Sequence, residues 1–234
     1  SCVSNEVGGD LVGNAIWRGI PLTELLDEAG VQPGATQIAS RSVDGWTCGF
    51  PTEAAYDGRT ALLAVGMNGE PLPIRHGFPA RLVVSGLYGY VSATKWIEEI
   101  ELTTLEDFDG FWIPRGWSKL GPVKTQSRID TPRRGAELQA GTTVPIAGVA
   151  WAPDLGVTKV EVRVDEGEWM EAELGQSLGP DAWIQWRVQW PATEGRHRVQ
   201  VRATDGSGTT QTPDPAPPAP DGAQGWHQIE IDVV

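Results

Sequence analysis

The second half of the chain alternates hydrophobic and polar residues with a period of two. Strict alternation occupies residues 160–165, 197–203 and 229–233, and turn signals such as Asp205-Gly206 separate the segments. Alternation of this kind places one face of each strand in a core and the other in solvent. About seven short strands of this kind after Ser127 predict an all-β sandwich of the immunoglobulin type.

Tryptophan is concentrated in the same half. Within residues 183–190, one strand face would carry Ile184, Trp186, Val188 and Trp190, and the opposite face would carry Trp183. Large aromatic rings bury much apolar area, so core filling is the first interpretation of this face. A subunit interface, where aromatic residues are enriched, is the alternative.

The first half mixes one helix signal with short strands. The helix signal is an apolar face made of Leu22, Leu25, Leu26 and Ala29. Pro21 suits the first helical position and Gly30 the C-terminal cap. Residues 61–65, 81–84 and 96–102 are predicted strands, whereas residues 108–131 lack periodicity and predict an ordered connection.

Composition and charge exclude several classes of function. The 234 residues carry a net charge of −13, and an acidic surface repels phosphate backbones, so nucleic acid is not an expected partner. No apolar run approaches the roughly 18 residues that a membrane-spanning helix needs. Cys2 and Cys48 are too few for a disulfide framework or a zinc or iron–sulfur site, although one disulfide between them stays an alternative.

One turn suggests an anion-binding site. Residues 73–81 are rich in glycine and proline and contain His76, Arg75 and Arg81, and Lys95 follows a glycine-rich segment. Arginine offers a rigid bidentate fork and lysine a point charge, so these cations on a fixed turn suit an anionic group such as a phosphate. A solvated surface is the alternative interpretation.

Longer motifs resemble one enzyme family. C-V-S-N at residues 2–5 and W-R-G-I-P-L at residues 17–22 resemble the cysteine segment of sulfite-oxidase-like molybdenum enzymes. M-N-G-E-P-L-P at 67–73 and H-G-F-P-A-R at 76–81 resemble that family's pterin-anchoring segment. The resemblance implies an α+β chain: a partial, mixed α/β cofactor domain over residues 1–124, N-terminally incomplete, then an all-β immunoglobulin-like dimerisation sandwich over residues 125–234.

The resemblance also implies residue roles. Cys2 would be the thiolate that binds molybdenum, because a soft sulfur suits a high-valent metal already held by the dithiolene sulfurs of the pterin. The alternative for Cys2 is a small buried hydrophobe. The cofactor, molybdopterin, would be bound by Asp44, His76, Arg81, Ala93, Thr94 and Lys95. For Asp44, an ordinary turn aspartate is the alternative.

Two departures from the family concern the substrate of the expected oxygen-atom transfer. The family's tyrosine near the metal corresponds here to Trp117, whose indole cannot titrate like a phenol. The family's substrate-side arginine of the sandwich corresponds to Ala219, which leaves Arg115 or Lys124 to supply positive charge. We therefore expect Arg115 and Trp117 to act beside Cys2, on a small S- or N-oxo compound better than on sulfite.

The resemblance implies partners and a setting as well. No haem motif lies in the chain, so single electrons are expected to pass to or from a carrier such as a cytochrome or a quinone-linked protein. A homodimer through the sandwich and a location outside the cytoplasm, or at a membrane through another segment, are expected. Because family members carry a cofactor-binding segment before their molybdenum cysteine, this chain alone should bind the cofactor weakly. The alternative function is a non-catalytic interaction or dimerisation module.

Overall fold

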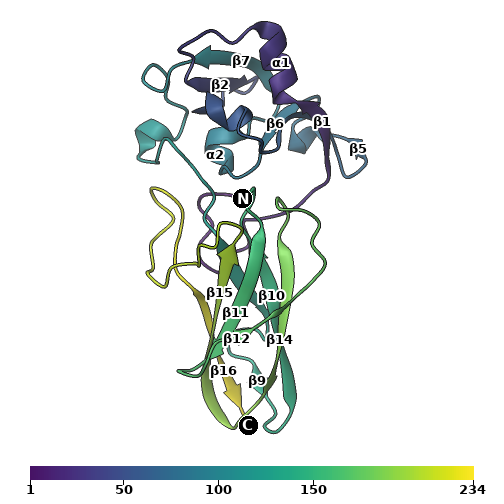
Figure 1. Cartoon of the computed structure of the whole chain (residues 1–234), viewed down its shortest axis with the longest axis vertical. Coiled ribbons are helices and arrows are strands. Elements are labelled where there is room, and N and C mark those ends of the chain that lie inside the picture. The colour runs from purple at the N-terminus through teal and green to yellow at the C-terminus, as the bar shows by residue number, and fades with distance from the viewer. The chain divides into compact units, whose positions relative to one another are not determined.

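The computed structural model describes residues 1–234, and the chain divides into two compact units (Figure 1). Unit 1 contains Ser1–Val3, Val12–Val123 and Ala219–Asp221. Unit 2 contains Ser4–Leu11, Lys124–Pro218 and Gly222–Val234. Two short segments, Ser4–Leu11 and Ala219–Asp221, thus belong to a different unit from their neighbours in the chain. No hydrophobic pattern in the sequence indicated this. Every helix is too short or too polar to cross a membrane.

The predicted helix of unit 1 is confirmed. α1 spans Leu22–Ala29, and its Leu22 and Leu26 side chains are buried. Gly30 has a left-handed backbone (φ +80°), and its N–H donates to the carbonyl of Leu26 at 2.9 Å. The helix ends there because glycine adopts this conformation without steric cost.

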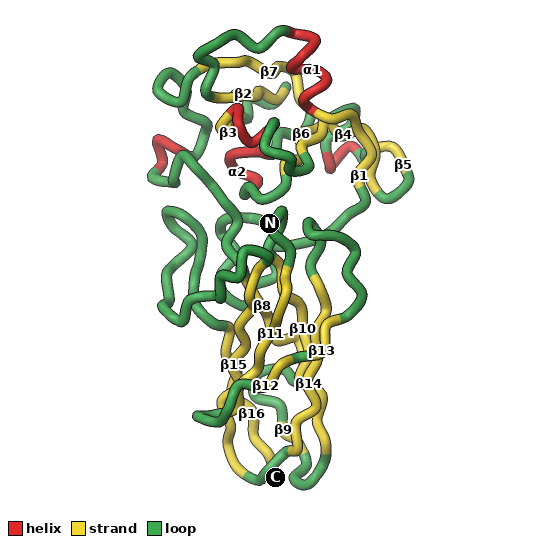
Figure 2. Tube along the Cα trace, viewed as in Figure 1, coloured by secondary structure: helices red, strands yellow, loops and turns green.

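Unit 1 contains two small sheets (Figure 2). The first has the order β1-β4-β5, with β6 also paired to β4, and its strands are β1 (Trp17–Pro21), β4 (Ala61–Met67), β5 (Glu70–Pro71) and β6 (Arg81–Val84). The second has the order β3-β2-β7, and its strands are β2 (Gln37–Ser42), β3 (Thr47–Pro51) and β7 (Ile97–Thr103). The predicted strands β4, β6 and β7 are confirmed. β2 escaped prediction because it buries the polar residues Gln37, Ser40 and Ser42.

Helix is a minor component of the chain, so the α+β description holds only loosely. α2 covers just Gly89–Ser92, and the remaining helical residues form the single 3-10 turns η1 (Thr52–Ala55), η2 (Ile74–His76) and η3 (Ile113–Arg115). The chain is mostly β because glycine and proline interrupt the first half before longer helices can form.

Unit 2 is a sandwich of two sheets. The orders are β13-β14-β10-β8 and β12-β11-β15-β16-β9. Its strands are β8 (Gln126–Thr131), β9 (Glu137–Leu138), β10 (Thr143–Trp151), β11 (Val157–Val164), β12 (Met170–Glu171), β13 (Glu173–Leu174), β14 (Ile184–Pro191), β15 (Gly195–Asp205) and β16 (His227–Val233). These are nine strands, more than the predicted seven or so, because three of them (β9, β12 and β13) have only two residues and carry no visible alternation. The predicted ordered connection over residues 108–131 overlaps the predicted β region from Ser127, and the structure begins β8 at Gln126, where it buries the polar pair Gln126 and Ser127.

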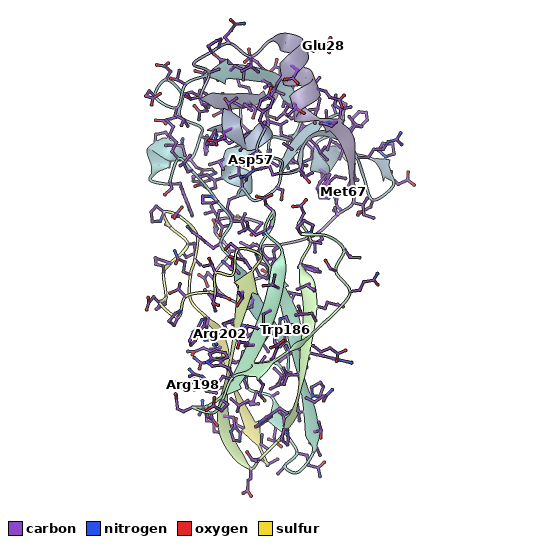
Figure 3. The ribbon with its side chains drawn as sticks, viewed as in Figure 1. Glu28, Asp57, Met67, Trp186, Arg198 and Arg202 are labelled. Atoms are coloured by element: carbon purple, nitrogen blue, oxygen red, sulfur yellow. The ribbon has the colours of Figure 1, made fainter.

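The sandwich core confirms the first interpretation of the tryptophans. Trp186 and Trp151 are each 2% exposed and Trp190 is 7% exposed. Alternate residues of β14 are buried and exposed along its whole length, and Figure 3 shows Trp186 within the body of the unit. In β15, the residues that alternate with the buried Val199 and Val201 include the cations Arg198 and Arg202 (Figure 3).

Candidate functional site

A cleft of about 330 Å³ lies in unit 1. Its lining residues are Ser42, Asp44, Trp46, Arg81, Ala93, Lys95 and Trp96. They come from the last residue of β2 and the turn between β2 and β3, the first residue of β6, and the segment that follows α2. Four of the six predicted cofactor-binding residues (Asp44, Arg81, Ala93 and Lys95) therefore meet in one cavity, although they are up to 51 positions apart in the sequence.

The β2–β3 turn provides an ionised carboxylate at the cleft. Asp44 Oδ1 accepts a hydrogen bond from the backbone N–H of Trp46 at 3.1 Å. This bond, followed by one with the Ser42 hydroxyl, lowers the pKa of Asp44. The carboxylate thus stays charged at neutral pH and can accept further hydrogen bonds from a ligand.

Arg81 provides a guanidinium that has no carboxylate partner. Its Nη1 donates to the carbonyl of His76 at 3.2 Å, and its Nε donates to the carbonyl of Leu82 at 3.4 Å. The guanidinium carbon lies 5.0 Å from the ring centre of Trp17. Burial lowers the pKa of Arg81, yet arginine stays protonated in proteins. A half-buried cation without a counterion suits an anionic ligand.

Lys95 and Trp96 are held by the turn at residues 74–77. Lys95 Nζ donates to the carbonyl of Arg75 at 3.2 Å and lies 4.3 Å from the ring centre of Trp96. Trp96 has a positive φ of 49°, and its Nε1 donates to the carbonyl of Ile74 at 2.7 Å. Positive φ is uncommon for a bulky residue, and such conformations cluster at functional sites.

Gly77 allows this turn to approach the cleft closely. Its φ is +112°, and a Cβ at this position would lie 3.1 Å from Arg81 Cβ and from Lys95 Cα and Cβ. His76 contributes its carbonyl to Arg81, while its half-buried side chain does not line the cleft. Thr94 is fully buried, so only its neighbours Ala93 and Lys95 reach the cavity.

Cys2 has an exposed, free thiol in unit 1, and Cys48 is a separate, buried thiol. The Ser1 carbonyl accepts the N–H of Gly89 at 3.3 Å, and Val3 packs with Tyr88 and Tyr90.

No group of three His, Cys, Asp or Glu side chains could hold a metal ion. A metal bound at Cys2 would have that thiolate as its ligand from this chain, and a dithiolene cofactor would supply further sulfur ligands. Together with the uncompensated Arg81 and the close approach at Gly77, the donor set fits an anionic pterin cofactor.

Arg115 and Trp117 lie in an aromatic cluster rather than in the cleft. The Trp117 ring centre is 5.8 Å from that of Tyr90 and 6.3 Å from that of Trp112. Arg115 is exposed and stacks on Phe111, with 3.7 Å from its guanidinium carbon to the ring centre. Burial, with the charge of Asp221 as a further cause, raises the pKa of Tyr90 to about 12, so this phenol stays neutral.

Sequence reasoning missed three residues that line the cleft: Ser42, Trp46 and Trp96. Ser42 and Trp46 lie two positions on either side of Asp44, and the Ser42 N–H donates to the Trp46 carbonyl at 2.9 Å across the turn. That spacing was the available signal. No local signal marked the positive φ of Trp96.

Comparisons with known proteins match both parts of the chain to families. Residues 1–112 match the family described as oxidoreductase molybdopterin binding domain, and residues 126–201 match the bacterial Ig domain family. Mitochondrial sulfite oxidase of Mus musculus is 31% identical over 260 residues, covering 95% of this chain and 47% of that protein. The uncharacterized oxidoreductase YuiH of Bacillus subtilis is 37% identical over 106 residues, covering 45% of this chain and 52% of that protein.

A solved structure shares the fold. The sulfane dehydrogenase SoxCD from Paracoccus pantotrophus superposes with a TM-score of 0.78 at 23% identity, covering all of this chain and 69% of that chain. The chain spans about half the length, 47%, of the mammalian relatives that it matches. It belongs to the sulfite-oxidase family of molybdopterin-dependent oxidoreductases and carries an immunoglobulin-like domain.

Proposed function

We propose that the intact protein catalyses oxygen-atom transfer coupled to two-electron redox at a molybdopterin cofactor held in the unit 1 cleft. The observation that carries this proposal is the meeting of Asp44, Arg81 and Lys95 in one cavity of the unit that also contains a free, exposed cysteine at residue 2. When bound, the cofactor supplies the redox chemistry and the exchange of the oxygen atom.

The residues of this chain would bind and orient that cofactor. Arg81 and Lys95 would hold its phosphate by charge, and Asp44 would accept hydrogen bonds from its N–H groups. The backbone around Ala93 and Thr94 would close the pocket, and the turn at His76 would fix Arg81. The Cys2 sulfur would be the protein's ligand to the metal.

The substrate that we propose is a small S- or N-oxo compound with little negative charge. Trp117 stands where the resemblance places a tyrosine, and an indole donates a hydrogen bond without titrating. The resemblance leaves Arg115 and Lys124 to supply positive charge to a substrate, and Arg115 is engaged with Phe111. Few cations are thus left for a dianion such as sulfite, although Arg115 stays the candidate for contacting the substrate.

The partners and the setting are proposals from the family. Because the substrate exchanges two electrons, a carrier such as a cytochrome or a quinone-linked protein would take or supply them singly. The sandwich of unit 2 would form a homodimer. The relatives include mitochondrial sulfite oxidases, and we propose a location outside the cytoplasm for this protein.

Residues beyond these 234 would complete the cofactor's contacts, so that this chain alone would retain it weakly. Metal analysis of the isolated chain tests this, and stoichiometric molybdenum would refute it. In the intact protein, Cys2→Ser should abolish turnover while the unfolding curve stays unchanged. Undiminished turnover would remove Cys2 from the mechanism, and an intact protein without molybdopterin would favour a non-catalytic dimerisation module.

A further inference from the structure

Three buried side chains form a hydrogen-bonded ring in unit 1. Ser40, Cys48 and Thr94 are each 0% exposed. Ser40 Oγ lies 2.7 Å from Thr94 Oγ1, Thr94 Oγ1 lies 3.1 Å from Cys48 Sγ, and Cys48 Sγ lies 3.3 Å from Ser40 Oγ. Each group has one hydrogen to donate and can accept another, so a closed ring satisfies all three. Burial raises the pKa of the Cys48 thiol, against the effect of its bonds to Ser40 and Thr94, and this keeps the S–H available as a donor.

The ring connects two walls of the cleft. Ser40 and Cys48 face each other across the β2–β3 pair, and each is two positions from a lining residue, Ser42 and Trp46. Since side chains two apart in a strand share a face, the ring lies on the same side of the hairpin as the cleft. Thr94 comes from the other wall, between the lining residues Ala93 and Lys95.

We propose that Ser40, Cys48 and Thr94 are positioning residues that hold the two walls of the cofactor cleft at a fixed separation. This inference rests on the proposed function of the cleft, and the side chains of the three ring residues do not themselves line the cleft. If one member is lost, the other two keep buried polar groups with fewer partners, and the segment at residues 93–95 loses its side-chain connection to the hairpin. The cleft would then open and release the cofactor more readily.

The test compares four variants of the intact protein with wild type. Cys48→Ala and Thr94→Val break the ring, whereas Cys48→Ser keeps a donor and an acceptor in place. Thr204→Val is the matched control, because it removes a hydroxyl bond of the buried Thr204 (2.9 Å, to the exposed Thr210) within unit 2. Retained molybdenum and pterin are measured during dialysis, and amide hydrogen exchange of residues 93–96 is measured without the cofactor.

Cys48→Ala and Thr94→Val should lose cofactor about tenfold faster than wild type and exchange faster at residues 93–96, as expected when a buried partner is lost. Cys48→Ser should stay close to wild type, and Thr204→Val should change neither readout. If Cys48→Ala does not fold, Ser40→Ala replaces it. Retention in the ring variants equal to that of Thr204→Val overturns the inference alone. A wild type that never contains cofactor overturns the proposed function and this inference with it.

Discussion

The close approach of the turn at Gly77 gives the sharpest test of how unit 1 builds its cleft. In Gly77→Ala, the new methyl group would lie 3.1 Å from Arg81 Cβ and from two atoms of Lys95. Two of these atoms are side-chain Cβ positions and one is backbone, so none can rotate away. The substitution therefore acts on the two cations that we assign to the cofactor.

The magnitude has two parts. A left-handed backbone costs a non-glycine residue about 1–2 kcal/mol. Overpacking of a tight contact costs about 1–3 kcal/mol more. We expect Gly77→Ala to lower the free energy of unfolding by about 2–5 kcal/mol. Gly69→Ala separates the two parts, because Gly69 also has a positive φ (+83°) but a Cβ there would meet nothing within 4 Å. It should cost only the backbone part.

Urea unfolding measures both variants, and metal analysis of the intact protein measures retained molybdenum. Gly77→Ala should lose both stability and cofactor, and Gly69→Ala should keep its cofactor. Equal losses of stability in the two variants, with equal retention of molybdenum, would show that the turn does not press on Arg81 and Lys95.

Three further predictions concern the cleft and the sandwich. Arg81→Met in the intact protein should weaken cofactor retention about tenfold or more, as loss of a charge-assisted bond does. Arg75→Met, which changes an exposed neighbour, should leave cofactor retention unchanged. Equal retention in the two variants would exclude Arg81 from cofactor binding. Burial would lower the pKa of His197, but hydrogen bonds to Asp165 (2.7 Å) and to the Thr193 carbonyl (2.7 Å) outweigh it and raise the pKa. Protonated His197 therefore contributes to the free energy of unfolding in full below the unfolded-state pKa of about 6.5, and this contribution is lost as the pH rises through the folded-state pKa. Urea unfolding across pH 5–9 should show this loss in wild type but not in Asp165→Asn. Burial, then the charges of Arg134 and Arg128, lower the pKa of His227 to about 4. The contribution of neutral His227 to the free energy of unfolding is therefore present above pH 6.5 and is lost as the pH falls toward 4. An NMR titration in which the midpoint of His227 lies at or above pH 6.5 would contradict this.

The sandwich was the more predictable unit because its chemistry is periodic. Residues 197–203 and 229–233 alternate, and the structure places them in the paired strands β15 and β16. Trp186 could be assigned to the core because its neighbours Ile184 and Val188 share its face. The two-residue strands could not be predicted, since a pattern of period two needs more than two residues to appear.

The cleft of unit 1 was predictable only in part. The cations Arg81 and Lys95 stand out in a turn rich in glycine and proline, and motif resemblance added Asp44 and Ala93. Trp96 was missed because its positive φ results from tertiary contacts, including the bond from its indole to Ile74. The ring of Ser40, Cys48 and Thr94 joins residues up to 54 positions apart, and no local pattern encodes such a contact.

The coordination of molybdenum by Cys2 is the claim on which the enzymatic account depends. X-ray absorption at the molybdenum edge, recorded on the intact wild-type protein and on Cys2→Ser, counts the sulfur neighbours of the metal directly. The account predicts that Cys2→Ser lacks one sulfur neighbour that wild type has, while both proteins contain the same amount of pterin. An identical number of sulfur neighbours in the two proteins would contradict it.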